Sequence, residues 1–309
     1  MDSVSGFFYC DVFFHLSQRF RRLIANEFRG RRFGLEAERY INLNPYTILQ
    51  IFRTWRPPSK DRLWSFRGLR EYPNFKQIEL MPVTELSQLK HLRFDAVHFG
   101  HRLDVPFKNP QSLNLNLMGK KVNELFKCVA YDACLSITDD SEDAVHVIKV
   151  LKSKISEFEL RNFSIFPNDS LETGLRYLST GKTLRIVRLM STYVQDETIF
   201  DHIFQQVDEV EITQHYPFGQ QGSYSSVWER LQCLLDLAEE EKDRPRIVDY
   251  SVTPMFGQFK KFNSDLEDRG FVMTSVNDEI NIKEFKLQIG NYHFTVFGDM
   301  IKIRIQMVQ

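Results

Sequence analysis

The chain has 309 residues, of which 42% are hydrophobic and 26% are charged, a balance that is typical of folded proteins and excludes wholesale disorder. The net charge of −1 excludes a strongly basic or acidic chain, but the charge is unevenly distributed. Residues 1–70 contain 13 Arg and Lys against 6 Asp and Glu, whereas the remainder contains 27 against 35. The N-terminal part is therefore basic and the rest is acidic.

The cysteines and the apolar segments indicate a reducing compartment and no membrane span. The four cysteines contain no Cys-x-x-Cys pair and have no regular spacing, so we expect reduced thiols at Cys10, Cys128, Cys134 and Cys233. No apolar run approaches the ~20 residues that cross a bilayer. The first residues lack the basic region and apolar core of a signal peptide. We expect a cytoplasmic or nuclear protein.

Residues 8–28 carry apolar side chains at steps of three and four, which predicts one stripe along helical structure. The stripe consists of Phe8, Val12, Leu16, Phe20, Leu23, Ile24 and Phe28. Six arginines lie between residues 19 and 32, and we interpret them as a solvated helix face. A phosphate-binding or nuclear-import patch is the alternative, although aromatic residues are not interleaved on the basic face. Residues 45–70 contain three prolines and two tryptophans, which predict a connector packed on the following region.

One short pattern occurs three times between residues 155 and 212. The copies are Ile155-x-x-Phe158-x-Leu160, Leu184-x-x-Val187-x-Leu189 and Val207-x-x-Val210-x-Ile212. Alternation of apolar and polar residues within each copy predicts a strand with one buried face. The segments after the first two copies carry apolar side chains at helical spacing. The copies repeat after 29 and 23 residues, which is compatible with leucine-rich-repeat units. The segment 245–250 resembles a further copy. We therefore expect a stacked strand–helix scaffold.

From residue 280 onward the apolar period changes to two, which predicts antiparallel strands. Ile301, Ile303, Ile305 and Met307 alternate with polar residues, and turn candidates such as Gly290-Asn291 separate the preceding segments. We expect this region to cap the scaffold, because terminal repeats must cover their apolar edge.

No motif predicts catalysis, a cofactor or a metal. Gly181-Lys182-Thr183 lacks the upstream glycine of a phosphate-binding loop and lies between a helix and a strand, the reverse of the required order. His98 and His101 lack a second ligand pair. We therefore predict a non-enzymatic protein without cofactors.

The opening residues Met1-Asp2-Ser3-Val4, followed by Phe8, Val12 and Leu16, resemble the start of F-box-like proteins in large nematode families. The resemblance covers about the first 50 residues. The usual Leu-Pro opening is replaced by Val4-Ser5, and a Trp-Arg pair occurs only at residues 55–56. The resemblance implies that Phe8, Val12 and Leu16 bind a cullin-ligase adaptor. Packing of the same residues on the first repeat is the alternative.

The predicted fold is an α/β, irregular leucine-rich-repeat-like solenoid. It has a helical F-box-like or capping region at 1–70, a solenoid at 71–255 and an antiparallel β cap at 256–309. We expect a protein-recognition module that acts as a substrate receptor of a ubiquitin ligase. Alternatives are an interaction protein without a ligase and, least favoured, a nucleic-acid-binding protein. The substrate-facing residues are predicted to be Glu157, Glu159, Arg185, Arg188, Asp208, Glu209 and Glu211, which would favour a charged protein surface.

Overall fold

The computed structural model of the chain describes residues 12–13, 16, 18–43, 46–52, 63–72, 77–81, 93–100, 113–117, 119–138, 142–161, 169–180, 183–216, 223–240, 242, 245–253, 259–277, 282–298 and 302–309. They form a mixed α/β structure, the class that the sequence predicts. The chain divides into two compact units, each described by itself: residues 1–139 with 146–157, and residues 140–145 with 158–309. This division cuts across the region 71–255, and the three regions expected from the sequence stay a prediction.

The first unit contains a mixed sheet with the strand order β6-β4-β1-β2-β3, in which β5 also pairs with β2. β1, β4 and β6 run parallel, whereas β2 is antiparallel to β1, β3 and β5. The elements are α2 (Gln18–Glu27), α3 (Arg32–Leu43), β1 (Tyr46–Phe52), β2 (Leu63–Tyr72), β3 (Gln77–Met81), β4 (Phe94–Gly100), β5 (Leu113–Asn116), α4 (Lys120–Lys127) and β6 (Val129–Ile137). α5 (Glu142–Leu151) and β7 (Ile155–Arg161) are divided between the two units.

The connector predicted at residues 45–70 is wrong, because β1 and most of β2 occupy this segment. β1 reads Tyr-Thr-Ile-Leu-Gln-Ile-Phe and is buried on both faces, as strands inside a mixed sheet are. Trp64 on β2 is 1% exposed, and its ring centroid lies 4.4 Å from that of Phe99 on β4. The prolines that suggested a connector, Pro45 before β1 and Pro57 and Pro58 after it in the chain, lie outside the described residues.

The predicted N-terminal stripe holds for some of its members: Val12, Leu16, Ile24 and Phe28 share one apolar cluster. Leu23, on α2, is 41% exposed, so it is not part of the buried stripe. The predicted solvated position of Arg21 is also wrong: this side chain is almost fully buried. Its Nε donates to the carbonyl of Phe13 at 2.7 Å, and its Nη2 lies 3.6 Å from Asp95 Oδ1 on β4. Arg21 therefore attaches the helix pair to the sheet of the first unit.

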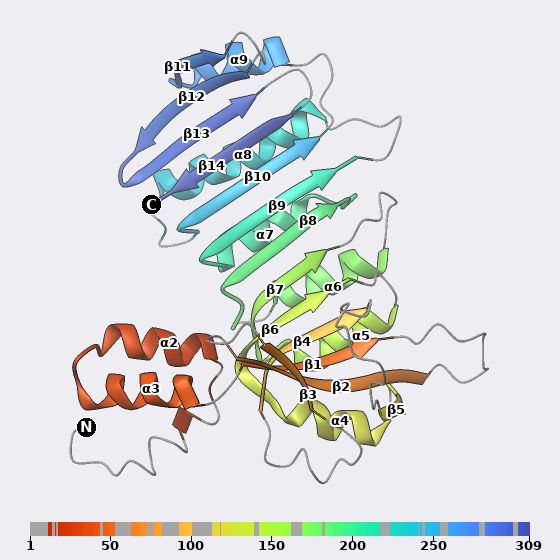
Figure 1. Cartoon of the computed structure of the whole chain (residues 1–309). Helices are drawn as coiled ribbons and strands as arrows, with labels where there is room; N and C mark the ends of the chain where they lie inside the picture. The colour runs from red at the N-terminus through yellow and green to blue at the C-terminus, as the bar shows by residue number, and fades with distance from the viewer. Residues whose placement is uncertain are drawn as a thin grey trace. The chain divides into compact units, whose positions relative to one another are not determined.

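The second unit consists of parallel strands followed by an antiparallel part, in the order β7-β8-β9-β10-β14-β13-β12-β11. β8, β9 and β10 run parallel, and the remaining pairs from β10 to β11 are antiparallel. The elements after β7 are α6 (Asp169–Ser179), β8 (Ile186–Thr192), α7 (Thr198–Gln206), β9 (Glu209–His215), α8 (Tyr224–Glu239), β10 (Ile247–Thr253), α9 (Phe259–Asp268), β11 (Val272–Asn277), β12 (Ile282–Ile289), β13 (Tyr292–Gly298) and β14 (Ile303–Val308). Figure 1 shows α7 and α8 behind these strands.

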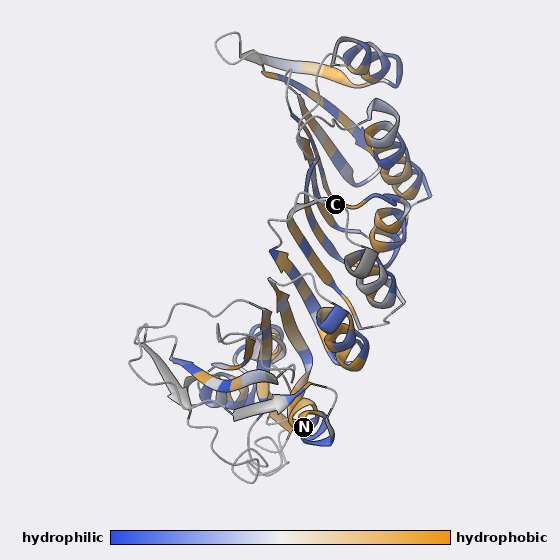
Figure 2. Cartoon of the chain, turned by 90° about the vertical axis from the view of Figure 1, so that its right-hand side faces the viewer, coloured by the Kyte–Doolittle hydropathy of each residue, from blue (hydrophilic) through white to orange (hydrophobic). Residues whose placement is uncertain are grey.

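Aligned buried residues form the core of the second unit. All nine apolar positions of the threefold sequence pattern are buried, and eight of them, all except Ile155, belong to this unit. One row crosses six strands in register and consists of Leu189, Ile212, Tyr250, Ile305, Val296 and Phe285. Figure 2 shows helices along one face of the sheet and alternating hydropathy along the strands. The helices α6 to α9 therefore cover one face only, and the row packs against them.

The antiparallel strands expected near the C-terminus are present as β11 to β14. Ile303, Ile305 and Met307 alternate as buried residues on β14, as predicted. Ile289 pairs with Tyr292 across the two-residue turn Gly290-Asn291. Gly290 has a φ of +55°, a conformation that side-chain-bearing residues rarely adopt, so glycine suits this turn.

Truncation of Phe158 tests the assignment of the two sheet faces. Phe158 is fully buried on β7, whereas Glu159 points to the opposite face and pairs with Arg161. Phe158→Ala should lower the free energy of unfolding by about 3–5 kcal/mol, because it leaves a cavity. Glu159→Ala should cost less than about 1 kcal/mol, because exposed ion pairs contribute little. Urea unfolding of both variants measures the difference; equal losses would contradict the assignment.

Candidate functional site

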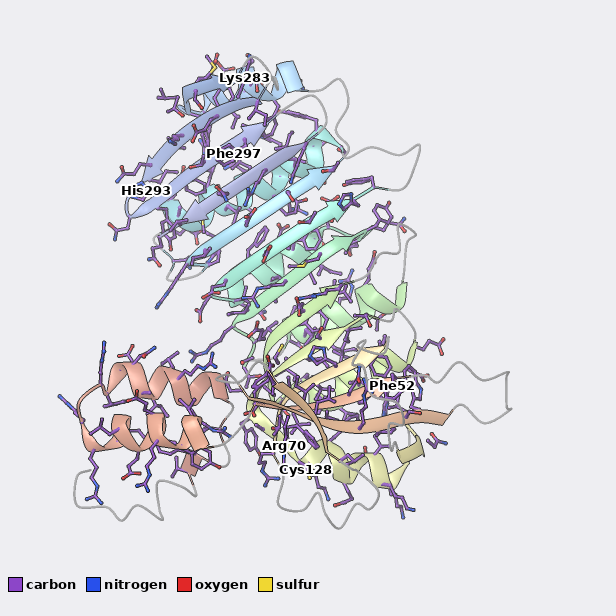
Figure 3. The ribbon with its side chains drawn as sticks, viewed as in Figure 1. Phe52, Arg70, Cys128, Lys283, His293 and Phe297 are labelled. Atoms are coloured by element: carbon purple, nitrogen blue, oxygen red, sulfur yellow. The ribbon has the colours of Figure 1, made fainter. Side chains whose placement is uncertain are left out.

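The face of the second unit's sheet opposite α6 to α9 is the candidate site, called the open face below. Along β9, β13 and β14, buried residues alternate with more exposed ones, as a sheet covered on one side requires; β10 follows this pattern except at the buried Ser251. In the described part of the second unit, no helix lies on this face. Figure 3 views the sheet from the side opposite its helices and labels Lys283, His293 and Phe297 on β12 and β13.

Four charged residues form a row across the open face, called the charge row: Arg188, Glu211, Asp249 and Arg304. Arg188 pairs in register with Glu211, and Arg188 Nε lies 3.7 Å from Glu211 Oε2. Glu211 in turn pairs with Asp249, so two carboxylates face each other on neighbouring strands. Arg304 donates to both oxygens of Asp249, with Nε at 2.8 Å from Oδ1. The two arginines thus flank the two carboxylates and offset their repulsion.

The charge row contributes little to folding, because water reaches it. The side chains of Arg188, Glu211 and Arg304 are 31%, 46% and 42% exposed. Hydrogen bonds to Asp249 raise the pKa of Arg304 above its ordinary value, so this guanidinium stays charged. Exposed pairs of this kind are typically worth less than about 1 kcal/mol. The charge row therefore exposes charged side chains to solvent, and its ion pairs contribute little to the stability of the fold.

The structure brings together only part of the predicted substrate-facing set. Arg188 and Glu211 lie in the charge row, and Glu209 lies two residues before Glu211 on the same strand. Arg185 and Asp208 precede their strands, and the Asp208 amide donates to the Arg185 carbonyl at 2.8 Å. Glu159 pairs with Arg161 on β7 at 2.7 Å. Glu157 belongs to the first unit.

The predicted adaptor-binding residues lie in a different environment. Val12 and Leu16 are partly buried and pack against the cluster of Phe13, Ile24 and Ala37 in the helix pair. Leu16 also forms an isolated parallel bridge with Tyr131. Phe8 lies outside the described residues. The contacts of Val12 and Leu16 are those expected of internal packing.

Sequence analysis did not include Asp249 and Arg304 among the candidate site residues, although the alternating pattern around each of them indicates an exposed strand position. Asp249 lies between the buried residues Val248 and Tyr250 of the fourth pattern copy. Arg304 alternates with the buried residues Ile303 and Ile305 of β14. Their meeting depends on the pairing of β10 with β14, which are separated by more than 50 residues. Local patterns predict the exposed face of each strand but not which strands become neighbours.

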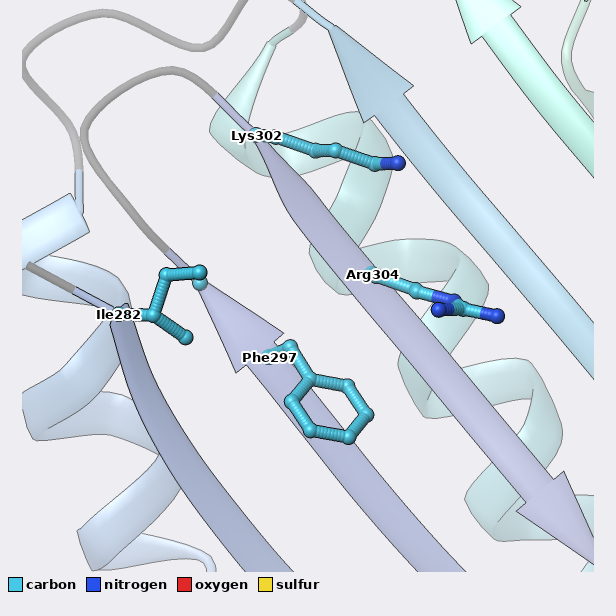
Figure 4. Close-up of a pocket in the computed structure, with 5 residues that line it drawn as sticks. Ile282, Phe297, Lys302 and Arg304 are labelled. Carbon is cyan, nitrogen blue, oxygen red and sulfur yellow. The ribbon is translucent and has the colours of Figure 1, made fainter. Parts of the chain in front are cut away.

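A hollow lies beside the charge row, between the ends of β12, β13 and β14. Its volume is about 220 Å³, and it is lined by Ile282, Phe297, Gly298, Lys302 and Arg304. Figure 4 shows Phe297 pointing from β13 toward the gap beside β14, whereas the side chains of Lys302, just before β14, and of Arg304 extend toward β10. Phe297 is opposite Arg304 in the strand register. The Arg304 guanidinium therefore lies toward Asp249 on β10, and the Phe297 ring lies on the other side of β14.

A second polar group lies near the carboxyl end of β9 and the middle of β10 and is called the Glu197 cluster: Glu197, Gln214, Tyr216, Ser226 and Tyr250. Glu197 precedes α7, where the helix N-terminus favours negative charge. Its carboxylate accepts hydrogen bonds from Gln214 Nε2 at 2.7 Å and from the hydroxyl groups of Tyr216 and Ser226. The Tyr250 hydroxyl lies 3.5 Å from Glu197 Oε2. The cluster therefore joins β9 and β10 to the start of α7 and to α8.

The two tyrosines of this cluster, and Cys233 in a separate environment on α8, are held in their neutral forms. Burial, followed by the nearby charge of Glu197, raises the pKa of both Tyr216 and Tyr250 above the ordinary tyrosine value. Burial also raises the pKa of Cys233, on α8, to about 12, so this thiol stays protonated and a poor nucleophile. The hydroxyl groups thus serve as hydrogen-bond donors to Glu197.

Neither comparison with known proteins nor a cluster of metal-binding side chains among the described residues assigns a function to the chain. Within the described ranges, no three His, Cys, Asp or Glu side chains gather closely enough to hold a metal ion. None of the described helices is both long and apolar enough to cross a membrane. No family model, curated protein or solved structure matches the chain. Any function must therefore be argued from the surfaces described above.

The raised tyrosine pKa values predict a loss of stability in alkali. Above pH 10 the unfolded chain releases tyrosine protons that the folded Glu197 cluster retains. The free energy of unfolding should therefore fall as the pH rises through the ordinary tyrosine pKa, by up to about 1.4 kcal/mol per pH unit for each tyrosine. In Tyr216→Phe the fall between pH 9.5 and 11 should be shallower, as measured by urea unfolding. Tyr131→Phe, at an exposed position in the first unit, is the control; an unchanged slope in Tyr216→Phe would contradict the prediction.

Proposed function

We propose that the protein is a non-enzymatic protein-recognition module whose ligand binds the open face of the second unit. The observation that carries this proposal is the charge row, in which fixed, solvent-reached charges lie on the face that the described helices leave uncovered. For stability alone, a solvent-exposed sheet face needs only polar side chains, and these need no particular order of charges. The order of two acidic residues between two basic ones provides a pattern that a complementary protein surface can match.

The repeated strand–helix units support a leucine-rich-repeat-like scaffold as the finer description of this module. Each unit from β7 to β10 places a buried pair on the helix side and a polar residue between them on the open face. Examples are Val187, Arg188 and Leu189 on β8. Solenoids bind their ligands through surfaces built in this way, from equivalent positions of successive repeats. The antiparallel strands β11 to β14 would then extend the binding face beyond the repeats.

A charge swap within the row tests the recognition function. The double variant Arg188→Glu with Glu211→Arg retains a cross-strand ion pair and the net charge but changes the order of charges on the open face. The matched control is Glu239→Arg with Arg269→Glu, a pair on the helix side with an Nη2–Oε1 distance of 3.0 Å. Cross-linked partners of the three proteins are identified by mass spectrometry, and binding is then measured with the purified partner.

The open-face swap should weaken binding of that partner at least about tenfold, because like charges then meet across the interface. The control swap should bind as the wild type does. Equal binding by all three proteins would contradict the proposed role of the open face.

We further propose that the helix pair α2–α3 connects the module to a ubiquitin-ligase adaptor, as the F-box-like start implies. The specific observation is that Leu23 on α2 and Leu35 on α3 are 41% and 54% exposed, although their neighbours Ile24 and Ala37 are buried. Exposed leucines on a short helix pair are suited to a partner's apolar surface. Arg21 faces Asp95 instead of solvent, so the basic character available for nucleic acid is smaller than the sequence suggests.

Substitution of the exposed leucines tests the adaptor proposal without disturbing the core. Leu23→Asp combined with Leu35→Asp should abolish co-purification with the adaptor, while the melting temperature changes little because both side chains contact water. Val12→Ala serves as the comparison, since Val12 packs internally and should lower thermal stability instead. Failure of the wild-type protein to bind the adaptor would eliminate the ligase function, and equal binding by the double variant would reject the exposed leucines as the docking site.

A further inference from the structure

We propose that the outer edge of β11 pairs with the same edge of a second copy of this chain, so that the sheets of two second units join into one. Among the described strands, β11 is the last of its sheet and pairs with β12 alone. An edge strand presents a row of backbone N–H and C=O groups, and another extended strand is the group that satisfies such a row. The proposal goes beyond the recognition function proposed above and does not depend on it.

The core of the second unit reaches this edge and is still open to water there. Met273 on β11 pairs in register with Phe285, the β12 member of the buried row, and so extends that row to a seventh strand. Phe285 is 1% exposed, whereas Met273 is 45% exposed. Phe271, just before β11, is buried on the same side of the sheet, where its ring centroid lies 6.5 Å from that of Phe294. One more strand beside β11 would cover Met273 and complete the row.

The sequence of β11 lacks most of the features that prevent edge strands from pairing. It reads Val-Met-Thr-Ser-Val-Asn, without a charge or a proline. Val272, which pairs with Lys286 on the open-face side, is 64% exposed. Lysine, other charged residues and proline are the usual protection against edge-to-edge association. A register shift between Met273 and Ser275 is the one protective feature in this strand, and it adds no charge.

The open end of the row favours a second copy as the occupant. An added strand must place an apolar side chain beside Met273, because a polar side chain buried there would lose its contact with water. A second β11 supplies this side chain when a twofold axis perpendicular to the sheet makes the two strands antiparallel and keeps the helices of both copies on one side. Parallel pairing about an axis along the strands would instead turn one sheet over and separate the two Met273 side chains.

The charges of α9, which contacts β11, complement each other in the same arrangement. Figure 1 shows α9 beside β11 at the end of the sheet. The helix reads Phe-Lys-Lys-Phe-Asn-Ser-Asp-Leu-Glu-Asp, so its start is basic and its end is acidic. This order is the reverse of the one that the helix dipole favours, so the stability of α9 does not account for it. The twofold axis places the acidic end of each α9 toward the basic start of the other.

Sedimentation velocity of the full-length chain tests the proposal. Between about 1 and 200 µM we expect a shift from monomer to dimer, with a dissociation constant on the order of tens of micromolar, as for a small interface. Met273→Lys should weaken the dimer at least about tenfold, because it introduces a charge at the end of the row. Val272→Lys, on the opposite face of the same strand, should have the same effect and decides the result if Met273→Lys does not fold.

Val308→Lys is the matched control, because Val308 is exposed to a degree comparable to Met273 but lies on β14, inside the sheet. This variant should form the dimer as the wild type does. Circular dichroism verifies that each variant is folded.

Hydrogen exchange, measured by mass spectrometry, locates the interface. In the dimer the outward N–H groups of residues 272–277 are hydrogen-bonded, so this segment should exchange at least about threefold more slowly at high than at low protein concentration. Residues 292–298 of β13, an interior strand, should exchange equally at both concentrations.

Three results would overturn the proposal: a monomer at every concentration, a dimer that the folded lysine variants of β11 leave intact, or slowed exchange in another segment instead of residues 272–277. A chain that stays monomeric while a different protein covers the edge of β11 also overturns it. The open-face swap, Arg188→Glu with Glu211→Arg, should leave the dimer unchanged. Failure of self-association and failure of the recognition function are therefore distinguishable.

Discussion

The second unit depends on the alignment of buried residues from strand to strand. Leu189, Ile212, Tyr250, Ile305, Val296 and Phe285 occupy one register row although they come from six strands of both orientations. A shift of one residue in any pairing would move that strand's apolar side chains from the helix side to water. The same register fixes the other face, because Arg188, Glu211 and Asp249 precede or follow members of the row. Core formation and the arrangement of the charge row are thus two results of one constraint.

Charged residues in this protein have two different physical roles, which burial separates. Asp95 and Arg21 are nearly inaccessible, and Asp95 Oδ2 also accepts from the Thr47 amide at 3.1 Å and the Thr47 hydroxyl at 3.0 Å. A buried charge requires such partners, because its transfer from water is costly. The side chains of the charge row are instead partly exposed to water. Interactions of the first kind specify the fold, whereas those of the second kind are available for exchange with a ligand.

Sequence patterns predicted much of the second unit and little of the first. The repeated copies and the alternation at residues 303–307 reflect local periodicity, which a single strand or helix reveals. Arg21 could not be placed in this way, because its burial depends on Asp95, 74 residues away, and an arginine beside an apolar stripe usually faces solvent. The strand β1 was missed since its even-numbered and odd-numbered residues are both buried, which removes the alternation. One residue of the Glu197 cluster is conspicuous in the sequence. The polar Gln214 follows Val210 and Ile212 at the same two-residue spacing, where a buried apolar residue is expected.

The position of β14 has a consequence for how the second unit is assembled during synthesis. β14 follows β11, β12 and β13 in the chain but lies between β10 and β13 in the sheet. Until a ribosome has made residues 303–308, β10 has an unpaired edge and the three preceding strands are not paired with any strand of the parallel part. Nascent chains with exposed strand edges are prone to misassembly and to chaperone binding. This sheet can therefore be completed only after β14 has emerged from the ribosome. Until then the parallel part of the sheet remains incomplete at β10.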